Sequence, residues 1–132
     1  MPFGTATVVT NSGKAVAAKR HLGATPTQAE PNYVAMGTGA TAAARTAAAA
    51  DAALSTPAES RVAGTGSTVT TTVTNDTYQT QGTITATAAR AVDEAGTFDA
   101  STGGNMDGSA TFAVINLANG DSLQLTVKKQ FT

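Results

Sequence analysis

The sequence predicts a mainly β protein, an antiparallel β-sandwich of jelly-roll-like or immunoglobulin-like form with one short N-terminal helix. Threonine accounts for 25 of the 132 residues, and β-branched side chains fit a pleated, half-buried strand better than a helix. In the second half, runs of such residues alternate with Gly, Asn and Asp turn signals, which is typical of a sandwich. The length indicates one domain, residues 1–132, in which residues 1–60 are partly irregular.

The hydrophobic core is expected to be thin. The chain has 28 Ala but only four Phe, two Tyr and no Trp, and burial stabilises in proportion to the apolar area removed from water. We therefore expect a second copy or another partner to supply additional burial, so that stability depends partly on assembly.

Charge and cysteine content argue against several function classes. Eight Lys and Arg face nine Asp and Glu, for a net charge of −1, which gives no electrostatic basis for binding nucleic acid or an anionic membrane. Without cysteine there is no disulfide framework and no thiolate chemistry. The N-terminal residues lack the basic start and apolar centre of a secretory signal, and no apolar run of about 18 residues predicts a membrane span.

Two short strands are expected in the first half. Residues 5–10 (TATVVT) predict one, and residues 33–36 (YVAM) predict the other. The connection at residues 24–32 contains two prolines and is expected to be irregular.

A helix is expected near residues 12–22. Asn11 or Ser12 suits the N-cap, the interior is rich in Ala, and Lys19 and Arg20 fall in the last turn, where cations complement the helix dipole. Gly23 is placed to end the helix.

The Ala-rich segment at residues 40–54 leaves two interpretations open. Its alanine content favours a helix, but it has no apolar stripe beyond Leu54, and isolated helices of this length are marginal in water. An extended segment lying over the surface is supported equally well. The preceding Gly37-Thr38-Gly39 is interpreted as a flexible hinge, because it lacks the third glycine of a dinucleotide fingerprint.

Residues 61–74 and 77–89 predict a hairpin that turns at Asn75-Asp76. In the second of these strands the side chains alternate with period two, which indicates one buried and one solvent-facing side. The two sets are Tyr78, Ile84, Ala86 and Ala88 on one face and Thr83, Thr85 and Thr87 on the other. Asn75-Asp76-Thr77 is also a formal glycosylation sequon, which we interpret as part of the turn.

The last quarter of the chain is expected to complete the sandwich. Residues 91–100 predict a short strand on each side of Gly96, and residues 100–108 predict a loop. Strands at 109–117 and 122–131 are joined by the turn signal Asn119-Gly120. The last strand places Leu123, Leu125, Val127 and Phe131 on one face.

No residue is assigned a catalytic, cofactor-binding or metal-binding role. His21 is the only histidine, so a zinc site of the usual ligands cannot be assembled, and an isolated imidazole lacks the partner that a catalytic base needs. Asp93-Glu94, Asp99 and Asp107 are close in sequence, but their spacing does not match a calcium loop, and no aromatic sugar platform accompanies them. Turn-forming carboxylates next to Gly account for the same residues.

Several short motifs, taken in order, resemble a family of small virion structural proteins of tailed bacteriophages. The motifs are TNSGK at 10–14, YVAMGTG at 33–39, DAAL at 51–54 followed by Glu59 and Arg61, TITAT at 83–87, EAGTFD at 94–99, TFAVINL at 111–117 and GDSL at 120–123. The resemblance covers nearly all of the chain. It implies a jelly-roll-like cement, or decoration, protein with no catalytic residues and no cofactor.

The expected function follows from this resemblance. The protein is expected to bind the major capsid protein on the capsid exterior as a homo-oligomer, a dimer or trimer, after synthesis in the bacterial host cytoplasm. One alternative is a tail-fibre or other tail-associated adhesion module of the virion. Another is a small carbohydrate-active enzyme using Asp93, Glu94 or Asp107, although the expectation is that the protein is not an enzyme.

Overall fold

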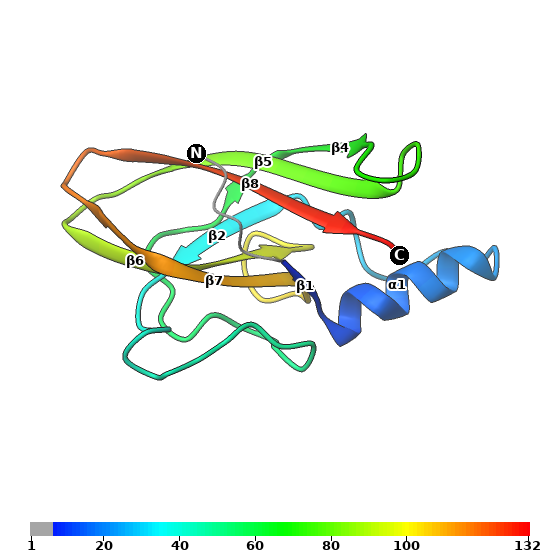
Figure 1. Ribbon diagram of the computed structural model, residues 1–132, viewed down its shortest axis with the longest axis horizontal. Coiled ribbons are helices and arrows are strands. Elements are labelled where there is room, and N and C mark those ends of the chain that lie inside the picture. Colours follow the sequence, from blue (N-terminus) through cyan, green and yellow to red (C-terminus); the bar gives the residue numbers. More distant parts are fainter. Residues whose placement is uncertain (1–6) are drawn as a thin grey trace.

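Two antiparallel β-sheets pack face to face, as the computed structural model of the chain shows for residues 7–132 (Figure 1). One sheet has five strands in the order β1-β7-β6-β2-β3, and the other has three in the order β4-β5-β8. The prediction of a mainly β antiparallel sandwich with one short helix is confirmed. The five-plus-three strand arrangement does not confirm the jelly-roll likeness, which stays a prediction.

The elements follow the chain in a simple order. They are β1 (Val8–Val9), α1 (Asn11–His21), β2 (Tyr33–Gly37), β3 (Val62–Ala63), β4 (Thr65–Val69), β5 (Thr77–Thr85), β6 (Arg90–Phe98), β7 (Met106–Leu117) and β8 (Ser122–Gln130). The helix lies at one end of the sandwich (Figure 1). Among residues 7–132, no helix is long and apolar enough to cross a membrane.

The main core lies between the two sheets. It is formed by Val34, Met36, Ile84, Ala86, Val92, Ala95 and Leu125, all of them buried. The predicted alternation is confirmed for residues 83–87, where Ile84 and Ala86 are buried while Thr83, Thr85 and Thr87 are exposed, but not at the start of β5, where Thr77 is buried. Ala88 follows the end of β5 and is exposed.

A second, smaller core lies on the opposite face of the five-stranded sheet. Ala35, Phe98 and Met106 contribute from the strands, and Leu54 covers them from the Ala-rich segment. This segment runs along the face of the five-stranded sheet that is turned away from the three-stranded sheet (Figure 1). It contains turns but no helix, so the extended alternative for residues 40–54 is confirmed and the helical one was wrong.

The helix begins one residue earlier than expected. Thr10, and not Asn11 or Ser12, is the N-cap, and its hydroxyl accepts a hydrogen bond from the Gly13 amide at 3.3 Å. The Thr10 hydroxyl also donates to the Met106 carbonyl, which ties the start of the helix to β7. The helix ends at Gly23 as predicted, where φ is +76°.

One turn prediction needs correction. The hairpin between β4 and β5 closes through the seven residues 70–76 because the Asp76 carboxylate accepts hydrogen bonds from the amides of Thr71, Thr72 and Val73. Asn119-Gly120 lies in a turn, as predicted, which is closed by a hydrogen bond from the Asp121 amide to the Ala118 carbonyl at 3.1 Å. It forms an arch that carries the chain from β7 in one sheet to β8 in the other, and Gly120, with φ at +92°, donates to the Ala86 carbonyl at 2.8 Å.

Three strand predictions also need correction. Instead of a short strand on each side of Gly96, one continuous strand, β6, runs through this glycine and ends at Phe98. A Cβ on Gly96 would lie 2.4 Å from the Met106 methyl group, so the glycine makes room for that side chain. Phe131 follows β8 and is 51 % exposed, so it does not join the core. Of the strand predicted at 5–10, only Val8–Val9 is a strand, and residues 5 and 6 lie outside the described residues.

Candidate functional site

The four carboxylates that are close in sequence, Asp93, Glu94, Asp99 and Asp107, lie in different surroundings in the fold. Asp93 and Glu94 are buried on β6, Asp99 shapes the loop after that strand by accepting from Asn105 at 2.6 Å, and Asp107 contacts a lysine on β8. Within residues 7–132, no group of three or more His, Cys, Asp or Glu side chains is placed to hold a metal ion. The four carboxylates therefore perform separate tasks, and the calcium-loop arrangement is not formed.

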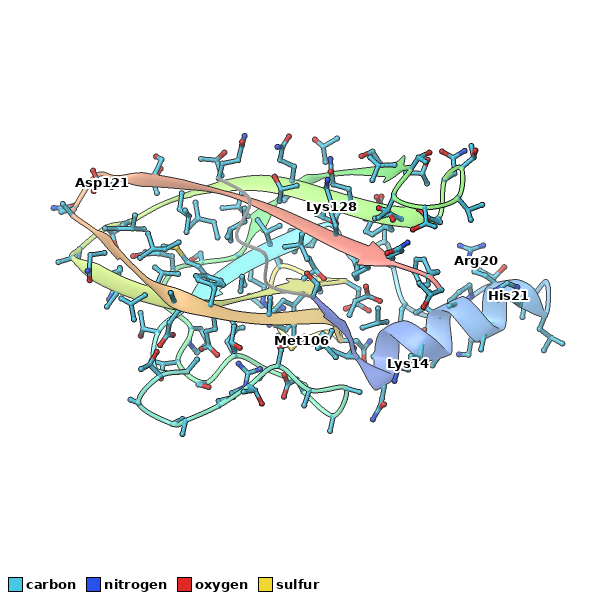
Figure 2. The ribbon with its side chains drawn as sticks, viewed as in Figure 1. Lys14, Arg20, His21, Met106, Asp121 and Lys128 are labelled. Atoms are coloured by element: carbon cyan, nitrogen blue, oxygen red, sulfur yellow. The ribbon has the colours of Figure 1, made fainter. Side chains whose placement is uncertain are left out.

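His21 lies at the outer end of α1, exposed to solvent and remote from the sheets (Figure 2). Lys19 and Arg20 share this last turn, and cations at a helix C-terminus interact favourably with the helix dipole. His21 therefore occupies a surface position in the last turn of the helix.

Two buried carboxylates on β6 anchor the Ala-rich segment. Arg45 donates to Glu94 at 2.5 Å and to Asp51 at 2.6 Å, and Ser109 on β7 lies within 2.9 Å of the same guanidinium. Glu94 is fully buried and also accepts from the Thr56 amide at 3.0 Å. Because each charge is paired and hydrogen-bonded, the segment is fixed to the sheet at both of its ends.

Asp93 fixes the beginning of the same segment. Its carboxylate accepts from the amides of Ala40 at 3.0 Å and Thr41 at 2.7 Å. Burial acts to raise the pKa of Asp93, but the hydrogen bonds from Thr41 and Ala40 prevail and hold it below its usual value. Asp93 is therefore a structural acceptor, and its carboxylate is enclosed by backbone amides.

The interpretation of Gly37-Thr38-Gly39 as a hinge was wrong for Gly37. This residue is the buried last residue of β2, and a Cβ on it would lie 2.5 Å from Glu94 Oε1 and 2.8 Å from the Thr56 carbonyl. Glycine is needed there so that the buried carboxylate can reach its partners. Gly39, with φ at +100°, makes the turn that follows.

A second charged cluster lies between the sheets, and sequence reasoning missed it. Lys129 on β8 has a side chain that is only 1 % exposed, and its Nζ contacts the carboxylate of Asp107 on β7. Nζ also lies 3.4 Å from the Thr97 hydroxyl on β6 and 4.7 Å from the centre of the Tyr78 ring. Lys129 thus reaches from the three-stranded sheet into the five-stranded one.

Opposing effects act on the protonation of Lys129. Burial lowers its pKa to about 7, because the ammonium form loses its hydration. The adjacent Asp107 carboxylate favours the ammonium. A signal for this cluster was present in the sequence, because Lys129 has the same alternation phase as Leu123, Leu125 and Val127, which face inward.

The outer face of the three-stranded sheet is polar and consists mainly of Thr, Ser and Gln side chains. Its exposed residues are Thr65, Ser67, Gln81, Thr83, Thr85, Ser122, Gln124, Thr126 and Lys128. Cross-strand hydrogen bonds join Gln81 to Thr126 at 3.1 Å and Thr85 to Ser122 at 2.7 Å. Because these side chains already restrain one another, little rotamer freedom remains to be lost when another surface covers them.

One edge of this sheet is open. Among the described residues, β8 pairs only with β5, through nine registered positions from Ser122 to Gln130. The other side of β8 carries main-chain donors and acceptors that a further strand can pair with.

A shallow hollow lies on the other side of the molecule. It has a volume of about 300 Å³ and is bordered by Leu54, Pro57, Arg61 and Phe98. Arg61 covers the Phe98 ring at 3.4 Å from its centre and donates to the carbonyls of Ala100 and Gly103. These interactions hold the Arg61 side chain in place, so the groups of Arg61 that border the hollow are already engaged within the fold.

Comparisons of the chain with protein-family models, with curated proteins and with solved structures found no match.

Proposed function

We propose that the protein is a cement, or decoration, protein of a tailed-bacteriophage virion, which binds the outside of the major capsid protein lattice and stabilises the head. The observation that carries this proposal is the exposed, hydrogen-bonded face of Thr, Ser and Gln side chains on the three-stranded sheet. The family resemblance of the sequence motifs adds to it. In this proposal the protein acts by adhesion and not by catalysis.

The proposed mechanism is repeated weak contact. A face of Thr, Ser and Gln offers many hydrogen-bonding groups and few large apolar anchors, so each contact is modest. On a symmetric shell the same contact recurs at every equivalent position, and linked copies gain avidity without a strong individual site. We propose that the protein binds as a homo-oligomer and that the open edge of β8 is available for pairing between copies.

The Ala-rich segment offers a second surface in this proposal. It is not a free arm that extends over neighbouring subunits, because Arg45 and Leu54 fix it to the five-stranded sheet. Its outward residues are small and exposed, so they form a second surface on the opposite side of the molecule from the threonine face.

The test uses virions from which the protein is absent, to which purified protein is added back. Particles without the protein are expected to release their genome at a lower temperature, and added wild-type protein is expected to restore the resistance. Thr83→Arg, at the centre of the polar face, is expected to abolish binding, because a long charged side chain would stand between the two surfaces. Ala15→Arg, exposed on α1, is the matched control and is expected to bind like the wild type.

Two outcomes would contradict the proposal. Particles that keep the same heat resistance without the protein would show that it does not stabilise the head. Location of the protein at the tail tip by electron microscopy would favour the tail-associated adhesion module instead.

A further inference from the structure

Lys129 and Asp107 form a contact that bridges the two sheets. Lys129 Nζ lies against the Asp107 carboxylate, and the exposed fractions of the two side chains are 1 % and 13 %. The lysine is on an edge strand of the three-stranded sheet, and the aspartate is at the start of β7 in the five-stranded sheet. An amine and a carboxyl group therefore meet in a nearly dry site, at a point where two separate layers of the fold join.

The surroundings hold both groups in place. The Asp107 carbonyl accepts from the Thr10 amide at 3.0 Å, which fixes the aspartate backbone. Gly108 leaves the path open for the lysine, since a Cβ there would lie 3.1 Å from Lys129 Cδ and 3.0 Å from the Thr97 hydroxyl. The Tyr78 ring lies on the Nζ group. The contact is thus pre-organised, and neither group has to move far to react.

We propose that Lys129 and Asp107 condense to an intramolecular isopeptide bond, an amide between Lys129 Nζ and Asp107 Cγ that joins β8 to β7. A proton first passes from the ammonium to the carboxylate, which leaves a neutral amine and a neutral acid. The amine lone pair then attacks Cγ. One carboxyl oxygen leaves as water, with the proton it received and one further proton from Nζ.

The reaction balances without any other reactant, because an ammonium and a carboxylate give one amide and one water. In open water the charged forms predominate and the condensation does not proceed. Burial penalises both charges, which favours the neutral pair, and it lowers the pKa of Lys129 to about 7. The Thr97 hydroxyl, 3.4 Å from Nζ, is placed as a positioning group that accepts a hydrogen bond from the amine.

The proposal does not depend on the capsid role. It concerns the chemistry of the folded chain alone, so virion experiments do not test it and a negative result there leaves it intact. Within the fold, such a bond would link the two sheets covalently. The chain has no cysteine, so no disulfide bond can supply such a link.

The experiment is an intact-mass measurement on the purified, fully denatured protein. The wild type is expected to be lighter than its sequence mass by one water molecule. Lys129→Met is expected to have its full sequence mass, whereas Lys128→Met, which alters the exposed neighbour on the same strand, is expected to keep the loss. After trypsin digestion, the peptides that contain Lys129 and Asp107 are expected to appear joined, with no cleavage after Lys129.

The wild-type measurement decides the matter even if Lys129→Met fails to fold. A wild-type protein at its full sequence mass would overturn the proposal, and the pair would then be an ordinary buried ion pair. A loss of water that persists in folded Lys129→Met would also overturn it, because it would come from cyclisation of Asp107 onto the Gly108 amide. Lys129→Arg, which retains the positive charge, is the second variant and is expected to show no loss of mass.

Discussion

Leu54 is the one large apolar side chain that the Ala-rich segment places against the five-stranded sheet. Its side chain is 6 % exposed and packs with Ala35, Phe98 and Met106. Leu54→Ala would remove this contact and leave the segment held by polar interactions alone. The matched control is Leu22→Ala, which makes the same chemical change at a position that is 84 % exposed.

The magnitude follows from the burial of the site. Substitution of a buried Leu by Ala costs about 2–5 kcal/mol, and the lower part of this range applies where the surroundings can close over the cavity. An irregular surface segment can do so, and we therefore expect a loss of about 3 kcal/mol for Leu54→Ala. With an unfolding entropy of about 2.1 cal/mol/K per residue, this loss corresponds to a fall in Tm of about 11 °C for 132 residues.

Urea unfolding followed by circular dichroism, together with thermal unfolding, measures both variants under the same conditions. Leu22→Ala is expected to change the free energy of unfolding by less than about 0.5 kcal/mol, as for exposed positions in general. Equal stabilities of Leu54→Ala and Leu22→Ala would refute the reasoning, because the segment would then contribute nothing to the core.

Two further predictions concern carboxylates. Glu94→Gln is expected to lower the free energy of unfolding by about 3 kcal/mol, because it removes one partner of a buried, charged network around Arg45. Glu30→Gln, at an exposed carboxylate, is the control. A similar effect of both changes in urea unfolding would contradict the structural role of Glu94. Asp76→Asn is expected to destabilise the 70–76 loop at neutral pH, because hydrogen bonds from the loop amides, Val73 first, hold the pKa of Asp76 well below the usual 3.8. Since the folded-state pKa of Asp76 is lowered, this stabilisation is present above about pH 4 and declines as the pH falls further. The difference in stability between the wild type and Asp76→Asn should therefore narrow in acid. A difference in urea midpoint that is the same at pH 7 and pH 3 would disprove the prediction.

Local patterns predicted the helix well and the bounds of the strands less well. The alternation of Ile84 and Ala86 with threonines depends only on neighbouring residues, and it identified the buried and exposed sides of residues 83–87. The helix was found from its alanines, its cationic last turn and Gly23. Its true cap, Thr10, was missed because Asn11 and Ser12 have equal or higher capping preference, and the choice was made by contact with β7.

Interactions between distant parts of the chain were not predictable in the same way. Arg45 is the one positively charged residue in the Ala-rich segment, but its partner Glu94 is 49 positions away, and no local pattern connects the two. The alternation along β8 indicates an inward position for Lys129, but no local pattern identifies Asp107 as its partner, because Asp107 lies on a strand of the other sheet. Gly96 was interpreted as a strand break because its reason is not local: the Met106 methyl group, which occupies the space of a Cβ at Gly96, belongs to the neighbouring strand.

The arch at Asn119-Gly120 has a consequence for the order in which the fold forms. β6 and β7 are adjacent in sequence and paired, so they can associate early through local contacts. The three-stranded sheet is different, because Gln81 on β5 meets Thr126 on β8 across 45 positions, and closing such a separation is slow. Until β8 has been synthesised, β5 presents an unpaired edge and the apolar faces of Ile84 and Ala86 lack Leu125. The newly made chain therefore passes through an aggregation-prone interval that ends when the last strand closes the sandwich.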